Sequence, residues 1–264
     1  MRPIPDAGSV LGVDIGWSKK RRTSGVCRLD WDLKSITFTY CRASLSERRQ
    51  TLLSMANRPL LVAAFDGPLS CKLNIIGRYR LAEQLLTRQL HAHIGKPGQS
   101  SSKVGMRLNH HANECATIII KTNYLSNATH IHHVHASAIV EAFPSSFLGV
   151  LIEQPQNLIT NRARRSDTFY CHLAQSGILL KLLLKLLPGR NFENNFNDAT
   201  HHDERAAVVC ALTALCVAAG NYTVVGDNVD GWIVLPPRSC ITPFAWGMLL
   251  QNAGDGGLEY FPTA

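Results

Sequence analysis

The chain has 264 residues, of which 45% are hydrophobic and 17% charged, and this composition predicts one large domain over residues 1–264, with its core at about 9–237 and a C-terminal tail at 238–264. Its eight cysteines are scattered singly without CxxC spacing, which excludes a disulfide framework or a zinc ribbon and favours a reducing, cytoplasmic compartment. The formal net charge of +8 suits a polyanionic partner such as nucleic acid.

The N-terminal part is predicted to form strands followed by a helix. Residues 9–13 are a short apolar run that ends at Asp14. Alternating segments at 24–31 and 35–41, joined by a polar turn, predict an antiparallel hairpin. A short helix is expected at 46–56.

The next part of the chain predicts a buried strand and two helices. The apolar run within 58–70 is typical of a strand covered on both faces, and Asp66-Gly67-Pro68 closes it. An amphipathic helix is predicted at 78–90. A loop rich in Gly, Ser and basic residues follows at 91–105, and a further helix is predicted at 106–125.

The C-terminal half is predicted to contain two strands and two long helices. A strand that carries Glu141 lies within 135–152, and a helix begins after Pro144. Helices are expected at 166–187 and at 203–220, separated by a polar loop, and the last strand at 230–237. The apolar run 177–189 is interrupted by lysines and too short to span a bilayer, so no membrane partner is expected.

This order of elements predicts a mixed α/β domain, with antiparallel pairing at the start and parallel strands afterwards. Four carboxylates lie where such a sheet places its active site: three at strand ends and one at the start of a helix. They are Asp14, Asp66, Glu141 and Asp203. Converging carboxylates need a cation to be stable, and hard oxygen ligands favour Mg²⁺ or Mn²⁺.

Each carboxylate also has a simpler interpretation. Asp14 precedes Gly16 and Asp66 precedes Gly-Pro, which is turn chemistry, while Asp203 is favoured at the positive end of a helix dipole. The simpler interpretation is weaker for the four carboxylates together, because turn chemistry alone does not explain why three of them follow apolar strands and the fourth begins an apolar helix.

The segments GVDIGW, AAFDGPL, RYRLAEQLL and VEAFPSSFL, with the helix HHDERAAVVCALTALCVAAG and the strand GWIVLPP, resemble the domain of unknown function family 429. That family is predicted to comprise nucleases with an RNase H-like fold. The resemblance implies an RNase H-like mixed sheet flanked by helices and matches its acidic positions to Asp14, Asp66, Glu141 and Asp203. The SKKRR turn, the histidine clusters and the C-terminal tail depart from the family pattern.

Basic and histidine side chains supplement the carboxylates. Candidate phosphate contacts follow Asp14 and flank the loop after Asp66: they are Lys19, Lys20, Arg21, Arg22, Lys103 and Arg107. His202 is a candidate metal ligand or proton shuttle beside Asp203. The histidines at 130, 132, 133 and 135 lack an HExxH or cysteine partner, so that stretch is interpreted as polar and exposed.

The sequence thus predicts a divalent-metal-dependent nuclease that hydrolyses phosphodiester bonds of DNA or RNA, with Asp14, Asp66, Glu141 and Asp203 as catalytic metal ligands. Two alternatives stay open. One is a catalytically inactive RNase H-like module that binds nucleic acid. The other is an actin- or sugar-kinase-like nucleotide-binding enzyme, which would need a second glycine-rich phosphate loop that this sequence lacks.

Overall fold

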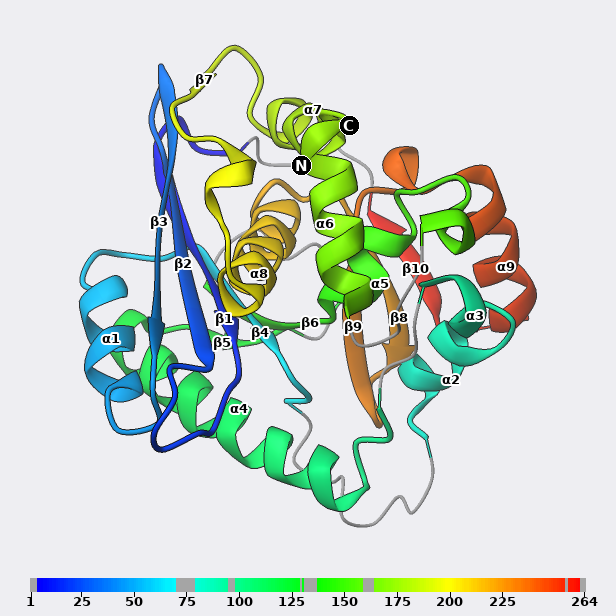
Figure 1. The fold of residues 1–264 in the computed structure, drawn as a ribbon, viewed down its shortest axis with the longest axis horizontal. Coiled ribbons are helices and arrows are strands. Elements are labelled where there is room, and N and C mark those ends of the chain that lie inside the picture. Colours follow the sequence, from blue (N-terminus) through cyan, green and yellow to red (C-terminus); the bar gives the residue numbers. More distant parts are fainter. Residues whose placement is uncertain are drawn as a thin grey trace.

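A computed structural model describes residues 4–69, 79–94, 98–128, 130, 137–158, 164–254 and 256–261. These residues form one ten-stranded sheet with parallel and antiparallel strands, covered by helices (Figure 1). The predicted α/β class, with a mixed sheet flanked by helices, is therefore confirmed.

The N-terminal half of the sheet begins with the predicted hairpin. β1 (Gly8–Asp14) pairs antiparallel with β2 (Ser24–Trp31), which pairs antiparallel with β3 (Ser35–Ala43). On its other side β1 pairs in parallel with β4 (Val62–Asp66), and β4 pairs in parallel with β6 (Ala138–Ala142). The carboxyl ends of β1, β4 and β6 therefore lie along one edge of the sheet.

The far half of the sheet returns to antiparallel pairing, whereas the order of elements in the sequence predicted parallel strands there. β9 (Gly231–Leu235) is parallel to β6, but β8 (Tyr222–Asp227) runs antiparallel to β9, and β10 (Leu258–Phe261) antiparallel to β8. β10 belongs to the segment expected to be a tail. Two-residue strands β5 (Ser126–Asn127) and β7 (Asn191–Phe192) pair with β6 and β3.

One face of the sheet is covered by four helices from the second half of the chain (Figure 1). They are α5 (Pro144–Gly149), α6 (Arg165–Gln175), α7 (Ile178–Leu186) and α8 (His202–Ala218). The single helix expected at 166–187 is in fact two, because Gly177 adopts a left-handed φ of 73° between α6 and α7. Short 3₁₀ turns at Pro155–Leu158 and Phe196–Asp198 connect these elements.

The opposite face carries the other helices, which pack in two groups. α1 (Arg48–Met55) and α4 (Lys103–Asn123) cover β1, β2 and β4 through Leu52, Cys115 and Ile119. α2 (Leu81–Thr87) and α9 (Pro243–Ala253) pack on β8 and β9, with the short α3 (His91–Ile94) and the 3₁₀ turn Arg238–Cys240 nearby. Along β4 the side chains alternate between the two faces: Val62 and Ala64 face α8, whereas Ala63 and Phe65 face α4.

Two glycines allow α8 to lie directly on the strands that lead to the sheet edge. A Cβ atom on Gly12 would meet the Ala211 nitrogen at 2.1 Å, and one on Gly25 would meet the Asp203 carbonyl oxygen at 1.9 Å. Gly25 is the register partner of Asp14. The first turn of α8 is therefore held against the start of β2, beside the end of β1, by backbone contact.

Among the helices in the described ranges, none has both the length and the apolar character needed to cross a membrane. Each cysteine within those ranges is free, as the spacing predicted. His130 is the one described member of its histidine group; residues 132, 133 and 135 lie outside the described residues. His130 is 2% exposed and its ring approaches the Tyr222 hydroxyl at 3.2 Å, so its predicted exposure is wrong.

Candidate metal centre

Asp14 and Asp66 form the centre of the candidate site. They are register partners at the last positions of the parallel strands β1 and β4, so their side chains project from the same face of the sheet. That face is the one covered by α8. Asp14 is 9% exposed and Asp66 is half-buried, and each carboxyl group affects the pKa of the other.

Asp203 reaches this pair from the first turn of α8. The close backbone contact at Gly25 places the helix start beside Asp14, and the Asp203 charge raises the pKa of Asp14. Arg42 on β3 approaches Asp203 at 3.8 Å and the neighbouring Glu204 at 3.6 Å. Three of the four predicted carboxylates, on two strands and one helix, thus gather at one edge.

The electrostatics of the group favour protonation. Burial, followed by the charges of Asp66 and Asp203, raises the pKa of Asp14 well above its usual range. Burial likewise raises the pKa of Asp66 to about 7, although the nearby His202 lowers it. No Lys or Arg of the described residues forms an ion pair with Asp14 or Asp66. If Asp14 and Asp66 are ionised, no ion pair with a Lys or Arg of the described residues neutralises their negative charge.

Glu141 does not join the three aspartates. It lies one residue before the end of β6 and is the register partner of Phe65, so it projects to the face opposite Asp66. There Arg80 binds it with both terminal nitrogens, Nη1 at 2.9 Å from Oε2 and Nη2 at 2.5 Å from Oε1. Its charge is already matched by a buried guanidinium.

Arg80 and Glu83 were not identified from the sequence, yet both are almost fully buried. Arg80 Nε donates to Glu83 Oε1 at 2.8 Å and Nη1 donates to the Asp230 carbonyl at 3.2 Å. Arg80 is the N-cap of α2, and Glu83 is three residues on, which is the spacing of a helix-start pair. The sequence signal was this Arg-x-x-Glu pattern, which resembles an ordinary exposed helix pair.

His202 is oriented by an acid from a different helix. Its Nδ1 lies 3.3 Å from Oδ1 of Asp167 on α6, and this hydrogen bond is the main cause of its raised pKa. Arg205 contacts the same Asp167 oxygen at 3.3 Å. Asp167 was not singled out from the sequence, because nothing local indicates that α6 packs beside the start of α8.

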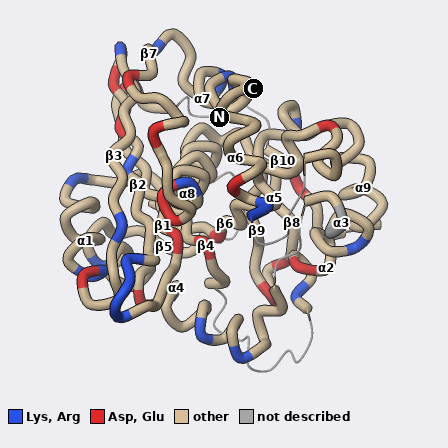
Figure 2. The backbone as a smooth tube through the Cα atoms, in the orientation of Figure 1, with Lys and Arg blue, Asp and Glu red and all other residues tan. Residues whose placement is uncertain are grey.

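The predicted phosphate contacts lie on two segments, the loop between β1 and β2 and the start of α4, and Figure 2 shows basic residues on both. Lys19, Lys20, Arg21 and Arg22 are exposed on the loop between β1 and β2, where Arg22 pairs with Glu47 at 2.7 Å. Lys103 and Arg107 are exposed on the first turns of α4. The Arg107 guanidinium lies 5.4 Å from the Trp17 ring centroid, which links the loop and the helix.

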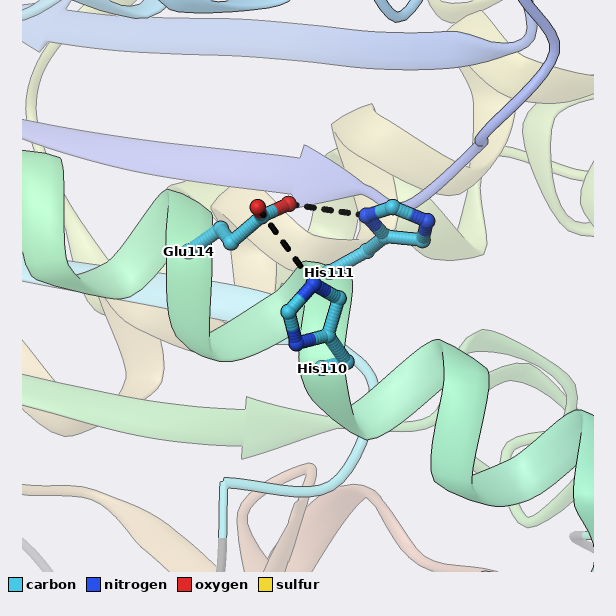
Figure 3. A group of neighbouring side chains, drawn as sticks. All are labelled: His110, His111 and Glu114. Atoms are coloured by element: carbon cyan, nitrogen blue, oxygen red, sulfur yellow. Dashed lines mark hydrogen bonds and ion pairs between the residues drawn. The ribbon is translucent and has the colours of Figure 1, made fainter.

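A compact group of metal-type ligands exists elsewhere, on α4 (Figure 3). Among the described residues, His110, His111 and Glu114 are the one set of three whose ligand atoms all lie within 4.8 Å of one another. The three aspartates are therefore spread more widely than this group. Glu114 already accepts from Arg48 at 2.9 Å, and Arg48 also donates to the Gly16 carbonyl at 2.9 Å. Arg48 therefore connects this group on α4 to the loop between β1 and β2, which is called the basic loop below because it carries Lys19, Lys20, Arg21 and Arg22. The positive charge of Arg48 would also repel a metal ion at this group.

Comparison of the chain with protein-family models, with curated proteins and with solved structures finds no match.

Proposed function

We propose that the chain is an RNase H-like, divalent-metal-dependent nuclease whose ion is held by Asp14, Asp66 and Asp203. The observation that carries the proposal is the in-register pair of the buried Asp14 and the half-buried Asp66. The pair faces a third aspartate and has no ion-paired Lys or Arg in the described chain. Such a group is unstable when ionised unless a cation neutralises it. Three carboxylates suit Mg²⁺ or Mn²⁺, which prefer oxygen ligands.

The order of the strands supports the RNase H-like assignment. An antiparallel β3-β2-β1 unit is followed in space by the parallel strands β4 and β6. The acids lie at the ends of the first strand and the next buried strand and at the start of a late helix, which is the RNase H-like layout. The antiparallel β8, β9 and β10 extend the sheet beyond β6.

Each residue has a defined part in this proposal. Asp14 and Asp66 hold the ion and Asp203 completes the acidic edge from α8. When bound, the ion supplies charge stabilisation for the phosphodiester and activates the attacking water. His202, oriented by Asp167, moves a proton at its free Nε2. The basic loop after Asp14 binds the phosphate backbone.

Glu141 has a structural part instead. It remains paired with Arg80, because removing either partner would leave the other charged and buried. We therefore assign the ion to the three aspartates alone.

A catalytically inactive nucleic-acid-binding module is the second candidate. It is favoured by the raised pKa values of Asp14 and Asp66, which burial causes, since a pair of carboxyl groups that holds a proton is stable without an ion. In that case the basic loop and the start of α4 would bind nucleic acid and no cleavage would follow.

Calorimetric titration of Mn²⁺ into metal-free protein tests the proposal, with wild type compared with Asp14→Asn and the exposed control Asp6→Asn. Binding to wild type and to the control, but not to Asp14→Asn, together with Mn²⁺-dependent cleavage of labelled oligonucleotides, is expected. Cleavage that survives both Asp14→Asn and Asp203→Asn would refute the proposal. Oligonucleotide binding in EDTA with a steep salt dependence, and no cleavage with Mn²⁺, would establish the second candidate.

A further inference from the structure

A cavity of about 190 Å³ adjoins the candidate metal centre at the carboxyl ends of β4 and β6. It shares Asp66 with the aspartate group. Its walls are largely apolar and come from the start of α4 and from the strand ends; they include Val104, Leu108, Phe143 and Ile233. A ligand in this cavity would therefore lie beside Asp66.

One wall of the cavity is polar and carries net negative charge. Glu141 and Glu83 both line it, and the single guanidinium of Arg80 lies between them. Four hydrogen bonds from Arg80 are already made, to the two carboxylates and to the Asp230 carbonyl. Glu83 Oε1 accepts three hydrogen bonds and Glu141 Oε2 accepts two, but among the described residues Glu141 Oε1 accepts one, from Arg80 Nη2, so this oxygen can still accept from a ligand.

Hydrogen bonds connect two of the segments that line the cavity. Glu83 Oε1 accepts hydrogen bonds from the backbone nitrogen of Ser100, at 3.2 Å, and from its hydroxyl. This ties the segment before α4 to α2. On the same segment, a Cβ atom on Gly105 would meet the Gln99 carbonyl at 2.4 Å, so the chain is closely packed there. These contacts support the wall of the cavity that the segment before α4 forms.

These properties select the chemistry of the occupant. A phosphate would be repelled by two carboxylates that share one guanidinium. The volume is below the range of sites that enclose a drug-sized molecule, so it suits one flat ring system rather than a whole nucleotide. The apolar walls suit the faces of such a ring, and the acceptor wall requires N–H donors at its edge.

We propose that this pocket binds the base of the nucleotide whose phosphate lies at the aspartates, and that it prefers bases with an exocyclic amino group. The position of the phosphate rests on the proposed function. Adenine, cytosine and guanine present amino donors to Glu141, whereas the N3–H of uracil or thymine is flanked by two carbonyl oxygens that a carboxylate would repel.

The test uses nucleosides, which carry no phosphate, and the full chain in EDTA, so that binding is measured apart from metal and cleavage. NMR titration gives the dissociation constant for adenosine, cytidine, guanosine and uridine. The blocking variant is Val104→Trp, because Val104 lines the pocket and is 66% exposed, so the larger ring fills the mouth without disturbing the core. The matched control is Leu33→Trp, which is equally exposed in the turn between β2 and β3.

Amino-bearing nucleosides are expected to bind wild type and Leu33→Trp at least about tenfold more tightly than uridine, as one hydrogen bond to a charged acceptor allows. Val104→Trp should lose this binding. Equal binding of uridine, or binding that Val104→Trp retains, would overturn the inference. So would the absence of nucleoside binding in a protein that cleaves oligonucleotides, and the proposed function would then stand. Nucleoside binding without any cleavage would support the pocket and refute the nuclease.

Discussion

Replacing Asp66 with asparagine should stabilise the metal-free protein. Burial raises the pKa of Asp66 from its ordinary value of 3.8 to about 7. A raised carboxyl pKa means that the folded state binds a proton more tightly than the unfolded state. The contribution of this proton to the free energy of unfolding is complete below pH 3.8 and is lost as the pH rises towards 7. At about 1.4 kcal/mol per pKa unit, the loss approaches an upper limit of about 4 kcal/mol. Asparagine keeps the shape and carries no charge, so it avoids this loss.

Urea unfolding in EDTA at several pH values measures the effect, with Asp6→Asn as the exposed control. The free energy of unfolding of Asp66→Asn should exceed that of wild type by an amount that grows between pH 4 and 7 and is constant above. Thermal unfolding should shift upward by roughly 2–4 °C per kcal/mol for a chain of this size. Adding Mn²⁺ should stabilise wild type and the control but not Asp66→Asn. A variant no more stable than wild type at pH 8 in EDTA would refute the reasoning.

Three further predictions concern residues outside the aspartate group. Glu141→Gln should lower the free energy of unfolding by about 3 kcal/mol, because it leaves a buried guanidinium underpaired; a neutral or stabilising effect in urea unfolding would contradict a structural role. Burial lowers the pKa of His130 to about 4. As the pH is lowered from 6.5 to 4, His130 is protonated in the unfolded state but not in the folded state, so the free energy of unfolding should decrease. That loss is at most about 3 kcal/mol, and a His130→Phe variant should lack it in the same urea series. Arg48→Met should cost about 2 kcal/mol by removing its hydrogen bonds to Gly16 and Glu114, and proteolysis within the loop between β1 and β2 should become faster; unchanged cleavage would show that Arg48 does not anchor the loop.

The sequence predicted those parts of the fold whose patterns are local. The hairpin of β2 and β3 has the expected alternation and polar turn, and α8 has its acidic first turn and its apolar length. β8 (Tyr222–Asp227) was missed: it is a short strand that begins four residues after Ala218 ends α8, and it has no strand pattern longer than a few residues. The pairing of β10 with β8 depends on a contact between distant segments, which no local pattern reports.

The candidate site was predictable in part for the same reason. Asp14 and Asp66 were found because each closes a strand, and parallel register then sets them side by side. Glu141 lies one residue short of the end of β6, and with a side-chain period of two this single residue turns it to the opposite face. Arg80 and Asp167 act on site residues from helices far away in the sequence. Their roles appear only once the packing of α2 and α6 is known.

The glycine contacts beneath α8 decide which part of the metal centre is able to move. With no side chain at Gly12 or Gly25, backbone atoms of α8 lie directly on β1 at Ala211 and on β2 at Asp203. A backbone shift that brings the aspartates closer around an ion is therefore expected at Asp66 and the adjoining Gly67 and Pro68 rather than at α8. Asp66, Gly67 and Pro68 also line the pocket. A base bound in the pocket and an ion bound at the aspartates would therefore both depend on the position of these residues. Binding of either one should change the affinity of the protein for the other.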